Sequence, residues 1–475
     1  MSFVSLSFIA VQLAALVLRA VTRRSRVAYL IGLLALSWLF YAWSVPEYLI
    51  LILFSTTVDY CVARLLAGTP PSARAARRGL LAVSLALNLG VLAYFKYAGF
   101  IARNWMSLAG GLGFWTPDVT TADIVLPIGI SFYTFESMSY TIDVYRGRIE
   151  AEKNFLRLAC FIAFFPHLVA GPIVRAGEFL YQFTRPRRFR TRVFAEGTYL
   201  VIRGLFLKMV VADNLGQLVD QHWRTAGAAA PTGTLAMSLL IFFACQLFCD
   251  FAGYTDIARG LAYQLGFRLP INFNAPYLAA TFTEFWRRWH ITLSSWMRDY
   301  VYIPLGGNQR GPVRVAFNVL LVMLVAGLWH GANWTFVAWG AMHGSAIVLE
   351  RMLGLARGPR PRMVGAAWYV VVQTTWILSL GMFRAEDVRQ GYQIIHNAMA
   401  GLATLPSSMP PSPGVISIGW WFVLPVVALH ARSLLTERRW LPAVSELEKA
   451  AYAGAMVAAI LTLYATSREF IYFQF

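Results

Sequence analysis

Charged residues are scarce in this chain of 475 residues, at 13% of the total, while hydrophobic residues make up 58%. A soluble globular domain carries about 25% charged residues. A soluble chain of this length would need more polar surface to cover its hydrophobic cores. The composition therefore excludes a soluble globular protein and indicates a protein that is embedded in a membrane.

Cysteine is scarce as well. The four cysteines, Cys61, Cys160, Cys245 and Cys249, all lie in apolar stretches. Burial among apolar groups keeps thiols unreactive, so we expect no disulfide framework. No cluster of His or Cys completes a zinc site. We therefore expect neither a metal site nor a bound cofactor.

Several familiar sequence signals are absent. The chain has no Gly-x-Ser-x-Gly elbow, no Walker loop and no His-x-x-x-His pair. It also lacks an internal repeat, a dividing linker and any similarity between its halves. Secondary transporters usually retain a trace of duplicated halves, so this absence argues against a transporter. We expect one membrane domain over residues 1–475.

Long apolar runs are the dominant feature of the sequence. A run of about 20 apolar residues spans the hydrocarbon core of a bilayer, and shorter runs are accommodated by tilting or breaking. We predict an all-α polytopic membrane protein with about eleven spans. They are Val4–Leu18, Val27–Trp43, Tyr48–Leu66, Leu80–Phe95, Phe155–Val169, Leu235–Leu247, Val315–Leu328, Phe336–Leu349, Ala366–Met382, Trp420–Leu429 and Ala450–Tyr464.

Basic residues outnumber acidic ones by 41 to 23, and they gather in clusters between the spans. Loops rich in Lys and Arg stay on the cytoplasmic side. The clusters therefore predict a cytoplasmic face, with the N-terminus and the C-terminus outside. Nucleic-acid-binding proteins are also basic, but this hydrophobicity argues against that class. The clusters are Arg19–Arg26, Arg64–Arg78, Arg185–Arg192, Arg351–Arg362 and Arg432–Arg439.

Three stretches differ from ordinary spans. Leu126–Tyr145 carries Glu136, Asp143 and several hydroxyls, so it is too polar to face lipid and should be buried in protein or line an aqueous cavity. Phe248–Tyr277 holds acidic residues and then prolines that should break its helix. Glu284–Tyr302 repeats aromatic residues at helical spacing between arginines, which predicts an amphipathic helix at the cytoplasmic interface with Trp in the headgroup zone.

His330 is the strongest candidate for chemistry among the seven histidines. Apolar runs flank it on both sides, and both outer flanks are basic, so Gly331–Asn333 should be the turn of a helical hairpin. That places His330 at membrane depth, where desolvation favours the neutral imidazole that a general base requires. The alternative is a buried histidine that only packs the hairpin.

The other histidines have weaker claims. His290 follows Trp289 on the amphipathic stretch, and it is either functional or an interfacial side chain beside Arg287 and Arg288. His167 lies between Pro166 and Gly171, where backbone breaks favour a structural role.

The motifs resemble the membrane-bound O-acyltransferase (MBOAT) family, and in particular its bacterial alginate O-acetylation branch. The resemblance runs from about Tyr94 to the C-terminus, although the region 384–450 is looser. It rests on residues 126–147, 164–175, 248–261, 266–277, 283–308, 327–344 and 470–475.

This resemblance implies a ring of about eleven transmembrane helices, with re-entrant and amphipathic helices, around a central tunnel. It implies His290 and His330 as the two functional histidines, with His330 as the catalytic one. We expect acetyl-CoA or another acyl carrier as the donor, with Arg287 and Arg288 attracting its phosphates. Asn333 is either an oxyanion donor or a turn-stabilising residue. The candidate donor-binding residues are Arg287, Arg288, Trp289, Trp329 and Asn333.

The resemblance also implies a location and partners. We expect a protein of the bacterial inner membrane that serves O-acetylation of an exported polysaccharide, with alginate and bacterial cellulose considered first. A periplasmic SGNH-type acetyltransferase would be the partner that completes the transfer. D-alanyl transfer to teichoic acid, a transporter and an export scaffold remain the alternatives.

Overall fold

The computed structural model is built from helices, and its described part contains no strand. It describes residues 5–43, 45–112, 124–169, 171–184, 189–225, 233–356, 358, 360–403, 413–465, 468 and 470–471. Six of the helices are long and apolar enough to cross a membrane, and Ser7–Val21 and Arg26–Ala42 are shorter apolar helices. The prediction of an all-α polytopic membrane protein is therefore confirmed, while the count of eleven spans and their arrangement as a ring stay predictions.

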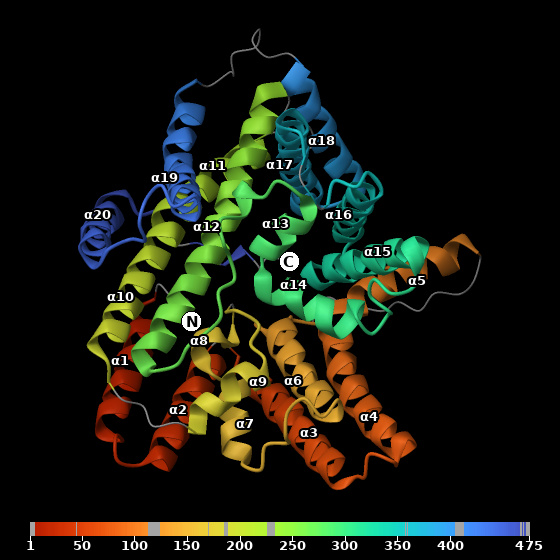
Figure 1. Cartoon of the computed structure of the whole chain (residues 1–475), viewed down its shortest axis with the longest axis vertical. Coiled ribbons are helices and arrows are strands. Elements are labelled where there is room, and N and C mark those ends of the chain that lie inside the picture. The colour runs from red at the N-terminus through yellow and green to blue at the C-terminus, as the bar shows by residue number, and fades with distance from the viewer. Residues whose placement is uncertain are drawn as a thin grey trace. The chain divides into compact units, whose positions relative to one another are not determined.

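The chain divides into two compact units, Met1–Thr198 with Ala258–Pro270, and Tyr199–Ile257 with Ile271–Phe475. Helices α10 and α12 contribute residues to both. The first part of the chain contains α1 (Leu6–Val21), α2 (Arg26–Ala42), η1 (Pro46–Tyr48), α3 (Leu49–Gly68), α4 (Arg74–Leu92), η2 (Ala93–Tyr97), α5 (Ala98–Gly111), α6 (Ile130–Tyr145), α7 (Phe155–Ile162), α8 (Phe165–Leu168), α9 (Ala176–Phe179), η3 (Leu180–Thr184) and α10 (Thr191–Leu205) (Figure 1).

The second part contains η4 (Phe206–Ala212), α11 (Asp213–Thr225), α12 (Gly233–Leu265), η5 (Pro276–Leu278), α13 (Phe282–Arg288), α14 (Ile291–Met297), η6 (Arg298–Tyr302), α15 (Gly311–His330), α16 (Trp334–Met352), α17 (Arg362–Arg384), α18 (Val388–Ala403), α19 (Pro413–Glu437) and α20 (Glu446–Leu463).

The predicted span Phe155–Val169 is wrong. These residues form two short helices, α7 and α8, with Phe164 extended between them. Pro166 lies in the first turn of α8, where its missing N–H is harmless. One continuous helix would instead need a hydrogen bond from residue 166 to the carbonyl of Ile162, which proline cannot donate.

The polar stretch at Leu126–Tyr145 is buried in protein, as predicted. It forms α6, and 14 of its 16 residues are buried. Asp59 on α3 accepts hydrogen bonds from Ser84, Asn88 and Thr141. These bonds give α6 partners within its own unit, so its polar groups need not meet lipid.

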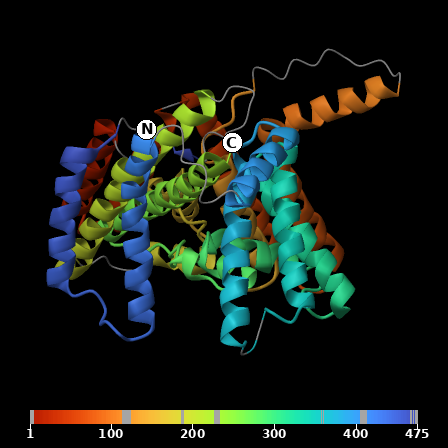
Figure 2. The ribbon, with the colours of Figure 1, turned by 90° about the horizontal axis from the view of Figure 1, so that it is seen from above.

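The hairpin predicted around His330 is also present. Helix α15 ends at His330, α16 begins at Trp334, and the two lie side by side (Figure 2). Their backbones approach so closely that a Cβ at Gly327 would collide with the carbonyl of Phe336, and one at Gly340 with the carbonyl of Met323. Small residues at such crossings are how membrane helices pack tightly.

The amphipathic helix predicted over Glu284–Tyr302 is wrong as a continuous element. Helix α13 ends at Arg288, α14 begins at Ile291, and η6 follows from Arg298. Trp289 and Trp296 are buried in protein rather than placed at an exposed interface. The break comes from His290, whose φ of 42° lies in the left-handed region.

A late segment of the chain is bound within the second unit through its main chain. Asp250 on α12 accepts a hydrogen bond from the backbone N–H of Ile471 at 2.7 Å. The buried ammonium of Lys208 lies 2.8 Å from both Asp213 and Asp250. The ring of Phe470 packs 4.2 Å from that of Tyr254. Residues 472–475 of the terminal motif lie outside the described residues.

Candidate active site

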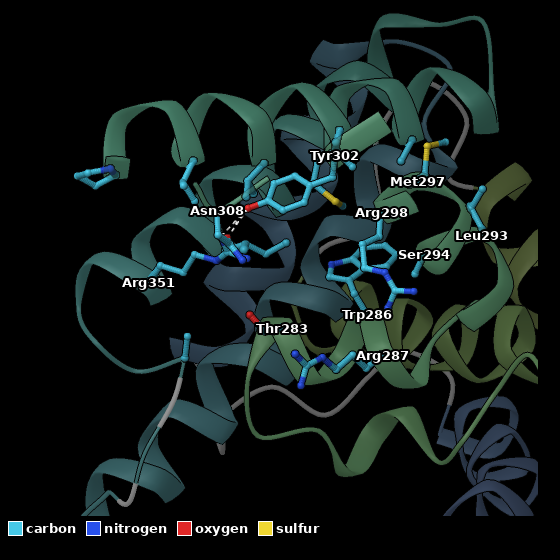
Figure 3. Close-up of a pocket in the computed structure, with 18 of the residues that line it drawn as sticks. Thr283, Trp286, Arg287, Leu293, Ser294, Met297, Arg298, Tyr302, Asn308 and Arg351 are labelled. Atoms are coloured by element: carbon cyan, nitrogen blue, oxygen red, sulfur yellow. Dashed lines mark hydrogen bonds between the residues drawn. The ribbon is translucent and has the colours of Figure 1, made fainter. Parts of the chain in front are cut away.

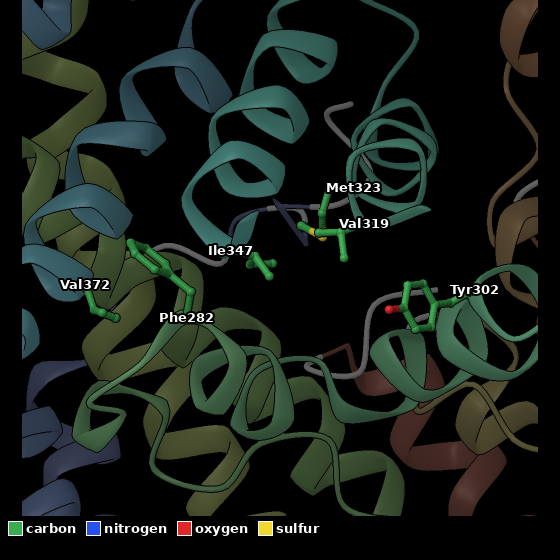
Figure 4. Packing of buried hydrophobic residues seen from close by; sticks show 6 residues of the cluster. All are labelled: Phe282, Tyr302, Val319, Met323, Ile347 and Val372. Carbon is green, nitrogen blue, oxygen red and sulfur yellow. The ribbon is translucent and has the colours of Figure 1, made fainter. Parts of the chain in front are cut away.

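A cavity of about 780 Å³ lies in the second unit, and His330 is part of its wall. Helices α13 to α16 surround it, and Figure 3 shows the side chains that point into it. One wall is apolar, because Val319, Met323 and Ile347 belong to a buried cluster with Tyr302 (Figure 4). The cavity therefore combines an apolar wall with polar groups, which is the usual character of a ligand site.

His330 is the last residue of α15, and its side chain is only 4% exposed. Its ring meets three aromatic rings edge to face, those of Trp329 at 5.1 Å, Trp339 at 5.2 Å and Phe383 at 5.3 Å. These contacts fix the orientation of the imidazole. The burial keeps the ring away from bulk water.

The two predicted histidines contact the same indole. Trp329 contacts the ring of His330 at 5.1 Å and that of His290 at 5.7 Å. His290 is fully buried, and its ring also meets Phe251 of α12 at 4.6 Å. Residues 40 positions apart in sequence thus share one aromatic cluster, although His290 does not line the cavity.

Of the two arginines predicted to attract the donor, only Arg287 lines the cavity. Arg288 is bound to two carboxylates, Glu437 at 2.8 Å and Glu284 at 3.0 Å. The hydrogen bond to Glu437 raises the pKa of the Arg288 guanidinium, so it stays charged within this ion pair. The geometry supports a structural role for Arg288.

The remaining predicted residues are placed as follows. Trp289 is buried against Trp376 at 4.6 Å and does not line the cavity. The Asn333 side chain accepts a hydrogen bond from Thr335 N at the start of α16 and donates one to the Glu386 carbonyl at 2.8 Å. Asn333 therefore stabilises the turn, and its role as an oxyanion donor stays a prediction.

Sequence reasoning missed two further arginines of the cavity, Arg298 and Arg351. Arg298 is held by Asp299 at 2.6 Å, and this hydrogen bond raises the pKa of the guanidinium. Arg351 donates to Tyr302 Oη at 3.2 Å and to Asn308 Oδ1 at 3.4 Å (Figure 3). The sequence places Arg351 in a cytoplasmic basic cluster. Its position in the last turn of α16, at the opposite end from the hairpin turn, is the feature that points to the cavity.

Two of these cations lack an acidic partner in the part of the chain that the structure describes. Arg287 and Arg351 form no ion pair with a described carboxylate, whereas Arg288 and Arg298 do. Uncompensated guanidinium groups in a partly apolar cavity attract anions strongly, and phosphate above all. The cavity is therefore suited to a ligand that carries phosphate groups, and His330 lies in the same wall.

Helix α13, which carries Trp286 and Arg287, is anchored by a buried carboxylate. Glu350 is 0% exposed and accepts hydrogen bonds from Phe282 N at 2.6 Å and Thr283 N at 3.1 Å. The indole of Trp368 donates to the same carboxylate at 3.1 Å. Glu350 thus fixes the start of α13 and with it one side of the cavity.

Substitution Glu350→Gln is expected to destabilise the protein. The amide NH₂ would face N–H donors and leave at least one of them unpaired, at a cost of about 1–3 kcal/mol. The unfolding midpoint of the purified protein in detergent should fall, while Glu47→Gln at an exposed position of η1 should leave it unchanged. Equal midpoints for the two variants would show that Glu350 does not anchor α13.

Comparison with known proteins identifies the family of the chain. The model of the MBOAT, membrane-bound O-acyltransferase family, matches residues 150–372, a range that includes His290, His330 and the cavity arginines Arg287, Arg298 and Arg351. The probable alginate O-acetylase AlgI of Pseudomonas aeruginosa is 41% identical over 372 residues, 78% of this chain and 70% of the relative. The peptidoglycan O-acetyltransferase of Helicobacter pylori is 34% identical over 399 residues, which cover 77% of this chain and 72% of the relative.

A more distant relative is the teichoic acid D-alanyltransferase of Streptococcus thermophilus, which is 30% identical over 239 residues, 47% of this chain and 56% of the relative. The similarity to acetyl-transferring relatives is higher and covers more of the chain. The chain belongs to the membrane-bound O-acyltransferase family and is a multi-pass membrane O-acyltransferase.

Proposed function

We propose that this protein is an acetyltransferase of the bacterial inner membrane. It takes an acetyl group from a cytoplasmic thioester, acetyl-CoA in the first instance, for O-acetylation of an exported polysaccharide such as alginate or cellulose. The observation that carries the proposal is one cavity lined both by His330 and by the uncompensated arginines Arg287 and Arg351. The names of the acetylating relatives support the acetyl group and the envelope polysaccharide.

The imidazole of His330 acts as the general base. It takes the proton of an acceptor hydroxyl, and the hydroxyl oxygen forms a bond to the acetyl carbonyl carbon. The tetrahedral oxyanion collapses, the carbon–sulfur bond breaks, and the leaving thiolate takes the proton from His330. The products are an acetyl ester and a free thiol. An acyl-His330 intermediate is the second route to the same products.

The acceptor hydroxyl belongs to the polysaccharide itself or to a periplasmic SGNH-type acetyltransferase that completes the transfer. In the proposed membrane topology, the basic clusters lie on the cytoplasmic side and both termini lie on the periplasmic side. The apolar wall of Val319, Met323 and Ile347 accommodates the uncharged thioester arm, and the arginines hold the phosphates.

The function is tested in membrane vesicles with the cytoplasmic face outward, which enclose the polysaccharide of the native host and receive labelled acetyl-CoA from outside. The expected result is label in ester linkage on the polymer, only when the protein is present. Export of polymer without added thioester would favour a transporter, and normal ester content with a His330→Ala variant would favour a scaffold. Transfer of labelled D-alanine from a carrier protein would favour the teichoic acid activity.

Substitution Arg351→Gln is expected to weaken donor binding. Loss of one charged hydrogen bond to phosphate costs about 1.5–3 kcal/mol, so KM for acetyl-CoA should rise about tenfold or more with kcat little changed. Arg314→Gln removes the same charge from α15, where Arg314 is exposed and does not line the cavity. An equal rise in KM in both variants would show a general charge effect and not a phosphate subsite.

A further inference from the structure

Asn272 is the polar side chain that holds His290. It is 1% exposed, and its Oδ1 lies 3.2 Å from His290 Nδ1, 3.2 Å from Thr292 N and 2.9 Å from Thr292 Oγ1. The Asn272 carbonyl also accepts a hydrogen bond from Ile291 N at 2.9 Å. Asn272 thus bonds to the ring of His290 and to the two residues that follow it, Ile291 and Thr292.

These contacts determine which way the amide of Asn272 points. A backbone N–H can only donate a hydrogen bond, so the Asn272 atom that faces Thr292 N must be the oxygen and not the NH₂ group. The usual ambiguity between amide oxygen and nitrogen is therefore removed by a neighbour whose role is fixed.

The same oxygen determines the tautomer of His290. An amide oxygen only accepts hydrogen bonds, so His290 Nδ1 must carry a proton to bond with it. In the neutral ring the lone pair then lies on Nε2. Nε2 is the ring atom that is able to accept a proton or a hydrogen bond.

The backbone of His290 indicates that this placement is not accidental. Its φ of 42° lies in the left-handed region, which is unfavourable for a residue with a side chain. Such strain persists where the surroundings over-determine the backbone, which is often at functional sites. The bonds to Asn272 stabilise this conformation, and it orients the ring toward Trp329 and, through it, toward His330.

We propose that Asn272 is a positioning residue of the acyl transfer site, which holds His290 as the Nδ1–H tautomer so that Nε2 presents its lone pair. This inference rests on the proposed function, because it assigns His290 a part in the same reaction. Asn272 does not line the cavity, so it acts through His290 and not on the donor.

The charged groups around His290 are few in the described part of the chain. On α12, beside Phe251, Asp250 is paired with Lys208. On α15 the titratable neighbour is His330, which also contacts Trp329. Arg287 and Arg288 precede His290 on α13, and Arg288 is paired with Glu437. A new carboxylate at position 272 would therefore be the dominant change in charge at the His290 ring.

The test compares pH profiles of acetyl transfer for Asn272→Asp, Asn272→Ala and Thr292→Val in vesicles. In Asn272→Asp the acceptor oxygen is kept, but its negative charge stabilises the imidazolium. His290 then stays protonated to higher pH, and the acidic limb of the profile should move up by about 1–3 pH units. Asn272→Ala should lose about 10²-fold in kcat, because the tautomer is no longer fixed.

Thr292→Val removes the hydroxyl that donates to Asn272 Oδ1 but leaves the bond between Asn272 and His290. The acidic limb of the pH profile should therefore stay at its wild-type position. Normal acetyl transfer by wild type and loss of transfer in a His330 variant establish the proposed function independently. Suppose that both control results are obtained, and that Asn272→Asp is active with the acidic limb of its pH profile at the wild-type position. Asn272 then does not act through His290, and the inference is overturned. If Asn272→Asp fails to fold, an undiminished kcat in Asn272→Ala overturns it.

Discussion

Replacement of His330 by alanine is expected to abolish acetyl transfer while the protein accumulates at normal levels in the membrane. The ring of His330 is the only imidazole in the cavity wall among the described residues. General base catalysis contributes about 10²–10⁴-fold to a rate, so the residual activity should lie below about 1%. The measurement is labelled acetate in ester linkage on the polymer, with the amount of membrane protein determined in parallel.

The matched control is His343→Gln. His343 is equally buried and hydrogen-bonded to Ser379 at 3.0 Å, but it does not line the cavity. Glutamine retains a hydrogen-bonding group of similar size, so this variant should keep most of its activity. Normal polymer acetylation by His330→Ala would mean that His330 only packs the hairpin, as the alternative interpretation of the sequence holds.

Replacement of Gly327 by valine is expected to prevent the hairpin from forming. A Cβ at this position would collide with the carbonyl of Phe336, which is backbone and cannot move aside as the end of a side chain can. Overpacking usually costs about 1–3 kcal/mol, and rigid neighbours raise that cost. We expect a loss above about 4 kcal/mol, which is in the exceptional range for one substitution, and little protein in the membrane fraction.

Gly79→Ala provides the contrast for this variant. Gly79 lies within α4, and no atom stands within 4 Å of a Cβ built there. Alanine favours a helix by about 1 kcal/mol over glycine, so Gly79→Ala should accumulate normally. Normal accumulation and thermal stability of Gly327→Val would mean that α15 and α16 do not pack by close backbone approach.

The sequence alone predicted the features that depend on local pattern. The hairpin followed from two apolar runs joined by Gly331–Asn333, and the burial of α6 followed from Glu136 and its neighbours in a membrane protein. The pairing of His290 and His330 as the two functional histidines came from the family resemblance. These signals extend over many residues, so a single irregularity does not obscure them.

What sequence reasoning missed depends on single backbone dihedrals and on contacts between distant residues. The aromatic spacing around His290 is helical, but one residue with positive φ divides it into α13 and α14. Arg288 was expected to bind the donor, yet Glu437, 149 residues away, binds it instead. Asn272 gave no signal, because its bond to His290 closes a loop of 18 residues whose path the sequence does not reveal.

The main-chain bond from Ile471 to Asp250 has a consequence for the biosynthesis of the protein. The two residues are separated by 221 positions, and the ribosome adds about 5–20 residues per second. For tens of seconds after α12 has been made, the carboxylate of Asp250 is therefore bound only by Lys208 among its described partners, because the N–H of Ile471 has not yet been synthesised. The speed of translation sets how long this unfinished state is exposed to chaperones and proteases, so slow codons after position 250 would be expected to lower the yield of mature protein.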